Sequence, residues 1–389
     1  MKLNGTEKKS TFIIAVIISL RLLGIFLILP VFSVYTSDYP QSTLTLAGIA
    51  FGIYALTQSL FQIPFGWASD KYGRKRILIL GLFLFSLGSI ICALAGNIYE
   101  LILARALQGS GAVGSVAIAS LGDTTRPQVR AQAFTVTGIV IGIAFIVSLV
   151  LGPLLAIEIG FNSLFYILGF LGIIGIVITY FLFPEIKKED TEPQSSSKIL
   201  EIIGNWDIKL LLSAAFILSF VLNLFLFIYP LSWTDLSIST SKFWLIYLII
   251  ILPSGLFTYP YIKHSERNNQ LKRAIFLAFI MLTAGFLLYL LGNKGRELLI
   301  ATGILFFLGH MIFQSLMPAF LTQRISSENR GVSSGVYNLA NFLGASFGGM
   351  LSGFLYSINI NLPLIICLLV LVLWAFIGLP RQPDRENIE

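Results

Sequence analysis

Long apolar runs separated by short polar segments dominate the chain. Stretches of about 18 to 23 mostly apolar residues are long enough, at about 1.5 Å rise per residue, to cross a hydrocarbon core of about 30 Å. The pattern predicts an all-α membrane protein with twelve transmembrane helices in two pseudo-symmetric six-helix bundles. The predicted spans are residues 12–34, 44–67, 76–96, 99–121, 132–155, 161–183, 209–230, 242–260, 274–292, 297–321, 333–356 and 361–379.

Composition and charge agree with this prediction. Of 389 residues, 56% are hydrophobic and 12% are charged, which excludes an ordinary soluble domain. With the N-terminus inside, 21 of the 26 basic residues fall in cytoplasmic segments, as the positive-inside rule requires. The net charge of +7 then reflects topology and attraction to anionic lipid, and indicates no nucleic-acid partner. The first span is too long for the apolar region of a signal peptide.

The longest polar stretch divides the chain into two halves. We predict an N-terminal bundle at 1–184, a cytoplasmic linker at 185–208, and a C-terminal bundle with a short tail at 209–389. An offset of 200 residues aligns Pro30 with Pro230 and Gly109 with Gly309. Parallel six-helix repeats are typical of secondary transporters that open a midplane site to either side.

A charged hairpin joins the second and third predicted spans. Asp70 ends a helix whose dipole disfavours a carboxylate there, so it needs a donor from Arg74 or from the start of the eleventh span at Ser333 and Ser334. One interpretation is a latch between the halves, and the other is a solvated positive-inside loop. The residues assigned to this loop motif and latch are Gly66, Asp70, Lys71, Gly73, Arg74, Lys75 and Asp123.

This hairpin resembles the signature between helices 2 and 3 of the major facilitator superfamily. Arg105, Gln108 and Gly109 resemble a second motif, which the drug:proton antiporters of that family carry. The antiporter motif of the fifth span is matched by Gly138, Gly142, Gly152 and Pro153, and Leu23, Gly24 and Pro30 resemble a motif of the twelve-helix branch. The glycines that usually follow Gly-Pro in the antiporter motif are missing here. Some related proteins end in a soluble domain, and we expect none, because the sequence ends ten residues after Leu379.

Three ionisable residues lie inside predicted spans, where retention indicates function. The resemblance implies a part in coupling for Arg105, whose alternative is an anchor bonded to helix carbonyls. Arg21 has no evident acidic partner and three open roles: binding carbonyls, attracting an anionic substrate group, or facing an aqueous cavity. His310 is either a proton carrier or a hydrogen-bonded core residue. None of the 19 acidic residues lies near the middle of a span.

Polar stripes on three spans are candidates for a substrate cavity. They occur at helical spacing, so each stripe shares one face, although interhelical bonding is the alternative for each member. The candidates are Tyr54, Gln58, Gln62, Gln314, Asn338 and Asn341. Abundant phenylalanine fits a lipophilic or amphiphilic substrate. Glycines of the fourth and eleventh spans are interpreted as packing surfaces.

The resemblance and these residues together predict a secondary active transporter working by alternating access. We expect proton-coupled efflux of small lipophilic or amphiphilic compounds, by a monomer in the bacterial inner membrane with both termini cytoplasmic. The alternatives are a specific metabolite or siderophore permease, or a receptor or scaffold that transports nothing. No catalytic constellation indicates an enzyme, and we expect neither cofactor nor metal. Cys92 and Cys367 are interpreted as packing residues in separate spans.

Overall fold

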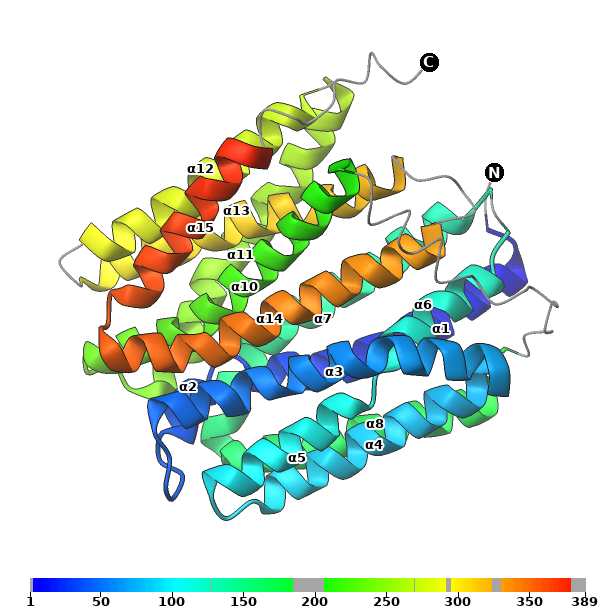
Figure 1. The fold of residues 1–389 in the computed structure, drawn as a ribbon, viewed down its shortest axis with the longest axis horizontal. Coiled ribbons are helices and arrows are strands. Elements are labelled where there is room, and N and C mark those ends of the chain that lie inside the picture. Colours follow the sequence, from blue (N-terminus) through cyan, green and yellow to red (C-terminus); the bar gives the residue numbers. More distant parts are fainter. Residues whose placement is uncertain are drawn as a thin grey trace.

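The computed structural model describes residues 3–126, 128–184, 206–268, 270–291, 295–323 and 330–378. Figure 1 shows long helices running side by side along a common direction. The first part of the chain forms α1 (Gly5–Ile28), α2 (Phe32–Thr36), α3 (Leu44–Tyr72), α4 (Arg74–Leu94), α5 (Ile98–Ser110), α6 (Val113–Asp123), α7 (Arg130–Ile159) and α8 (Phe161–Leu182). The second part forms α10 (Trp206–Asp235), the short helix η1 (Thr240–Lys242), α11 (Phe243–Arg267), α12 (Leu271–Leu291), α13 (Arg296–Gln323), α14 (Arg330–Ile358) and α15 (Leu362–Gly378).

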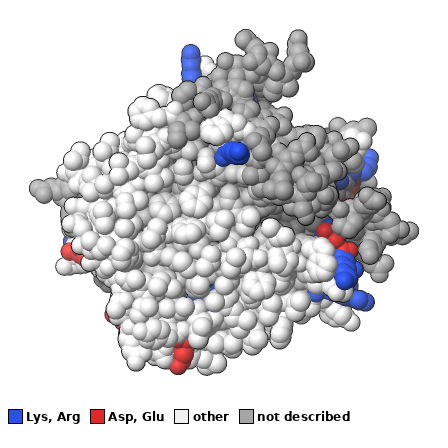
Figure 2. Space-filling view, in the orientation of Figure 1, with Lys and Arg blue, Asp and Glu red and all other residues white. Residues whose placement is uncertain are grey.

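The described chain is helical and apolar, which confirms the predicted fold class. Ten of its helical segments are long and apolar enough to cross a membrane, and α15 is a shorter apolar helix of 17 residues. The helix α14 is rich in glycine and serine and occupies the eleventh predicted span. Figure 2 shows most charged side chains around the edge of the view, with a broad surface of other residues between them.

The helix pairings of the first half recur in the second. In the first half α1 packs on α7, α3 on α5, and α4 on both α5 and α8. In the second half α10 packs on α14, α11 on α13, and α12 on both α13 and α15. The order of partners along the chain is the same, as expected of two pseudo-symmetric bundles. The predicted linker falls mostly on 185–205, outside the described residues, so its boundaries stay a prediction.

The two halves meet closely near α2, where glycines let α3 and α14 cross. A methyl carbon added at Gly52 would stand 2.5 Å from the carbonyl oxygen of Ser346 and 2.7 Å from the amide nitrogen of Met350. One added at Gly349 would stand 2.9 Å from the Cα of Gly52. Figure 1 shows α3 and α14 spreading apart away from α2. We call the two ends of the bundle the α2 end and the hairpin end, the latter bearing the turn between α3 and α4.

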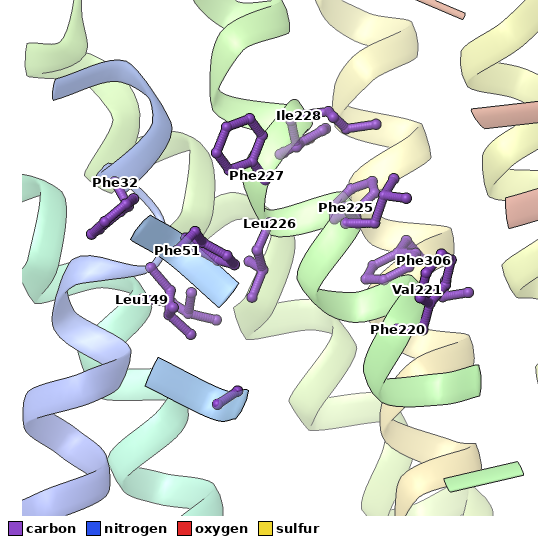
Figure 3. Close-up of a cluster of buried hydrophobic side chains, with 14 of the residues drawn as sticks. Phe32, Phe51, Leu149, Phe220, Val221, Phe225, Leu226, Phe227, Ile228 and Phe306 are labelled. Carbon is purple, nitrogen blue, oxygen red and sulfur yellow. The ribbon is translucent and has the colours of Figure 1, made fainter. Parts of the chain in front are cut away.

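Phenylalanines fill the space between the halves on the α2 side. Phe51 of α3 approaches Phe227 of α10, with ring centroids 5.7 Å apart, and Figure 3 shows both within a buried apolar cluster. Phe225 and Phe306 stack at 3.8 Å within the second half. These rings are buried. Phe225, Phe227 and Phe306 therefore form packed core in this state of the molecule.

The fourth predicted span is broken in its middle. Instead of one helix over 99–121, α5 ends at Ser110 and α6 begins at Val113. A methyl carbon added at Gly111 would collide with the backbone of α4, so this point of the chain lies directly against its neighbour. Tight local bonds, such as the one from the Val113 amide to the Gly111 carbonyl at 2.8 Å, replace helical ones there. The break places a helix N-terminus inside the bundle.

Candidate functional site

At the hairpin, Arg74 gathers the acidic groups of its own half. Its guanidinium lies 2.5 Å from Asp70 and donates at 2.9 Å to Asp123, at the end of α6, and at 2.6 Å to Ser69. Asp70 is 63% exposed. The alternative donors, Ser333 and Ser334, have side chains outside the described residues. In this state Asp70 therefore takes its partner from the next helix of the same half, and a latch to α14 stays a prediction.

The remaining hairpin residues shape the turn and its surface. Gly73, in the turn of the hairpin, has φ +95°, a backbone conformation that favours glycine. A methyl carbon added at Gly66 would stand at ordinary contact distance, 3.9 Å, from Ser115 of α6. The ammonium groups of Lys71 and Lys75 lie over the rings of Trp67 and Tyr180, at 5.1 and 5.3 Å.

Arg105 is buried and bonded mainly to backbone. It donates to the carbonyls of Ala50 at 3.3 Å and Phe51 at 3.4 Å, and to the side chain of Gln108 at 2.6 Å. Its guanidinium also lies 4.8 Å from the ring centre of Tyr54. This geometry matches the anchor alternative, because Arg105 ties α5 to α3 beside the crossing with α14. A part in coupling stays a prediction.

Arg21 lies deep between α1 and α3, with neutral partners. One terminal nitrogen donates to the Tyr54 hydroxyl and to the Gln58 side-chain oxygen, both at 2.6 Å. The side chain is 3% exposed, and its Nε has no hydrogen-bond partner among the described residues. None of the ion pairs found within the described ranges involves Arg21 or Arg105. Two guanidinium groups thus contact one tyrosine without a carboxylate.

The polar stripe of α3 faces its own half. Gln58 and Gln62 are buried, and a methyl carbon added at Gly114 of α6 would lie 3.9 Å and 3.7 Å from their amide nitrogens. Neither amide nitrogen has a partner in the described part of the chain. Together with Tyr54, these residues form a polar core between α1, α3 and α6. The structure does not place them on a surface between the two halves.

The other cavity candidates are dispersed over the second half. His310 is buried and stacked on Phe306, and its Nδ1 has no partner in the described part of the chain. Gln314, one turn away, is exposed, so the two do not share one environment. Asn341 of α14 accepts a bond from Ser219 of α10 at 2.8 Å, in the manner of interhelical bonding. Asn338 is half-buried.

The antiporter motif divides along α7. Gly152 lies directly against the backbone of Leu27 in α1, and Pro153 beside it is buried. Gly138 and Gly142 have open space where a methyl group would stand. Between α7 and α11, a methyl carbon added at Gly255 would stand 3.5 Å from the side chain of Ile146. Only the Gly152 end of the motif therefore acts as a packing surface here.

Several bonds escaped prediction. Glu7 accepts two bonds from the guanidinium of Arg126, at 2.8 and 3.0 Å, and so ties the start of α1 to the segment between α6 and α7. The capping pattern from Asn4 to Glu7 was a readable signal for that helix start. At the α2 end Tyr39 bonds to Asn162, and burial raises the pKa of Tyr39 to about 12. Tyr39 and Asn162 are 123 positions apart in the sequence, and no sequence pattern predicts a contact between them.

Comparison with known proteins gives the family. A model of the Major Facilitator Superfamily matches residues 14–349 and 211–388. The inner membrane transport protein YajR of Escherichia coli (strain K12) is 32% identical over 368 residues, which cover 91% of this chain and 79% of that protein. The quinolone resistance protein NorA of Staphylococcus aureus (strain COL) is 27% identical over 398 residues, covering 98% of both chains.

Solved structures agree on the fold. A D-xylose–proton symporter superposes with a TM-score of 0.79 at 15% identity, over 98% of this chain and 99% of the other. The nucleoside transporter NupG gives a TM-score of 0.71 at 15% identity, over 98% of this chain and 100% of the other. The chain therefore belongs to the major facilitator superfamily, whose members are multi-pass membrane transporters of small molecules and not enzymes.

Proposed function

We propose that this transporter exports small lipophilic or amphiphilic compounds in exchange for protons. The observation that carries the proposal is the likeness to a quinolone resistance protein over 98% of both chains. The antiporter-type residues around Arg105 and Gly152 support it. The buried aromatic groups between the halves also support it. If these rings move toward the midplane when the halves separate, they present an apolar surface to a lipophilic substrate.

The proposed topology places the hairpin end and both termini in the cytoplasm of a bacterial cell. Basic side chains at the hairpin, among them Lys71, Arg74 and Lys75, support this orientation. With that topology, the glycine crossing at the α2 end closes the transporter toward the outside. Alternating access then requires α3 and α14 to separate there while the hairpin end closes. We propose a monomer as the working unit, because each chain holds both halves.

In this scheme Asp70 acts after the halves have closed at the hairpin end. Its pair with Arg74 is local and solvent-exposed, so exchanging it for a donor of α14 costs little. His310 and Arg105 are the proposed coupling residues. His310 is an imidazole within a span, and Arg105 reaches the crossing through the carbonyls of Ala50 and Phe51.

Inside-out vesicles test the proposal directly. Vesicles carrying the wild type, Arg105→Ala or no transporter are energised to an acid interior, and a dye reports internal pH while lipophilic compounds are added. Proton release evoked by a compound, absent without transporter, supports exchange. Loss of that release in Arg105→Ala supports the coupling role, provided that the variant is present at wild-type level.

A specific metabolite or siderophore permease is the second candidate. The placement of acidic residues favours it, because helix ends and loops hold all 19 and a proton-carrying carboxylate within a span is missing. If no compound of a broad panel evokes proton release from the vesicles, and cells lacking the protein show a growth defect on a single nutrient, this function would replace drug exchange. Absence of any evoked proton release, together with a stable soluble binding partner, would indicate a receptor or scaffold.

A further inference from the structure

The break between α5 and α6 leaves a helix N-terminus in the polar core. The residue before α6, Ala112, provides no side-chain cap. The first N–H groups of a helix have no partner within it, and they carry the positive end of the helix dipole. Gly114, the second residue of α6, stands against Gln58 and Gln62. The amide of Val113 donates to the carbonyl of Gly111 at 2.8 Å, so the donors that the first turn of α6 can offer to the polar core begin at Gly114.

The side chains around this turn also have donors to spare. Three donors, Arg21 Nε, Gln58 Nε2 and Gln62 Nε2, and one acceptor, Gln62 Oε1, are buried without a hydrogen-bond partner among the described residues, so unpaired donors outnumber unpaired acceptors there. Burying an unpaired polar group costs free energy, so such a concentration of unpaired donors in one place points to an acceptor that completes it. They come from α1 and α3, and both helices pack on α6.

The charge of this place is positive and uncompensated. Arg21 has neutral partners, and the one acidic residue of α6, Asp123, lies at the far end of that helix and is paired with Arg74. A guanidinium, amide donors and a helix N-terminus together favour an anion with several acceptor oxygens. Arg105 differs, because its donors already meet the carbonyls of Ala50 and Phe51 and the oxygen of Gln108.

We propose that Arg21, Gln58, Gln62 and the first turn of α6 form a binding site for a carboxylate, and that the transported amphiphile carries this carboxylate. The inference rests on the proposed function, which it deepens by naming the charged group of the substrate. Because the spans supply no mid-membrane acid, the substrate brings the negative charge that neutralises Arg21 in the occupied state.

Binding to the purified full-length protein tests this site. The probes are a quinolone carboxylic acid and its methyl ester, which differ in charge at one group. The wild type should bind the acid at least about tenfold more tightly than the ester, the value of one charge-assisted hydrogen bond. In Arg21→Gln the ratio should fall toward one, and Arg21→Lys should keep part of it. Gln62→Leu leaves Arg21 in place, and it should lower the affinity for the acid while the affinity for the ester stays unchanged.

The matched control is Arg130→Gln. Arg130 belongs to the same half and donates to the carbonyl of Gly122 at 2.9 Å, away from the polar core. This variant should keep the wild-type ratio of acid to ester affinity. A thermal unfolding midpoint near that of the wild type shows that each variant is folded. If Arg21→Gln is not folded, Gln62→Leu still tests the site.

The outcomes separate this inference from the proposed function. Equal affinity for acid and ester in the wild type, or an unchanged ratio in both Arg21→Gln and Gln62→Leu, overturns it. Repeating the titration at increasing chloride concentration identifies an inorganic occupant. If chloride binds through Arg21 while acid and ester bind equally, the site holds a small anion and the inference fails. Acid-selective binding without any drug-evoked proton release in vesicles refutes the efflux proposal and leaves the carboxylate site standing.

Discussion

Adding one methyl group at Gly52 should shift the balance between the two access states. The new carbon of Gly52→Ala would stand 2.5 Å from the Ser346 oxygen and 2.7 Å from the Met350 nitrogen, and a Cβ rarely approaches a neighbour more closely than 3.0–3.4 Å. Both obstacles are backbone, so no side chain can rotate away. The helices α3 and α14 must separate by about 0.5–0.9 Å, or the halves must part at the α2 end.

Overpacking of this kind costs about 1–3 kcal/mol, and about 1.4 kcal/mol changes an equilibrium constant tenfold. The cost falls on the state in which the α2 end is closed. The helix-propensity gain of alanine over glycine, about 1 kcal/mol, stabilises both states equally and cancels. We therefore expect Gly52→Ala to raise the population open at the α2 end by about five-fold to 150-fold relative to the closed one.

Spin-label distances report this shift. With both native cysteines replaced by alanine, one pair of labels at Ser37 and Ser357 spans the α2 end, and a second pair at Lys71 and His264 spans the hairpin end. All four positions are exposed. Gly52→Ala should lengthen the distances of the first pair and shorten those of the second.

The control for helix propensity is Gly138→Ala in α7, where an added methyl group meets open space. It should leave both distance distributions as they are in the wild type. If Gly52→Ala also leaves them unchanged, the glycine crossing does not set the access state, and the reasoning from backbone contact is refuted.

Three further substitutions test other contacts. Arg105→Ala removes bonds to two carbonyls and one amide and should lower the free energy of unfolding by about 2–4 kcal/mol, measured by denaturation in detergent; a loss below about 0.5 kcal/mol would contradict the anchor geometry. Glu7→Gln removes a charge-assisted pair, so its melting temperature should fall and depend less on salt than that of the wild type. Asp70→Asn should hardly change the free energy of unfolding, because the pair of Asp70 with Arg74 is exposed to solvent. If the latch exists, the same variant should reduce the outward-open population, and label distances between the hairpin ends of α3 and α14 should lengthen.

The fold was within reach of the sequence because its signals are local. Apolar length marks the spans, charge marks their ends, and a turn glycine marks the hairpin at Gly73, so each element could be predicted without knowing its neighbours. The break in the fourth span was not visible in this way. Gly111 lies among the small residues Gly109, Ser110 and Ala112 within a stretch of span length, and the chain leaves helical geometry there where it lies against α4. That is a tertiary contact, which hydropathy does not record.

The candidate site was predictable as a set of residues but not as an arrangement. The spacing of Tyr54, Gln58 and Gln62 correctly gives them one face of α3, yet spacing cannot say what that face meets. Arg21 decides it, by drawing Tyr54 and Gln58 toward α1. On α13 the same spacing misleads, because one turn separates a buried His310 from an exposed Gln314, and helix periodicity alone cannot locate the boundary of burial.

The two buried arginines show why burial and charge alone do not identify a functional residue. Both lie inside the first half, and both contact Tyr54. Arg105 donates its hydrogen bonds to fixed backbone carbonyls, so its charge is stabilised whether or not a ligand is bound. Arg21 keeps an unpaired nitrogen beside unpaired amides and a helix N-terminus, so its free energy depends on what enters the polar core. A group whose stabilisation changes with occupancy biases a conformational equilibrium directly, whereas Arg105 acts in the proposed coupling by holding α5 on α3. By this criterion Arg21 is the stronger candidate for linking substrate to the movement of the halves, although the motif resemblance singles out Arg105.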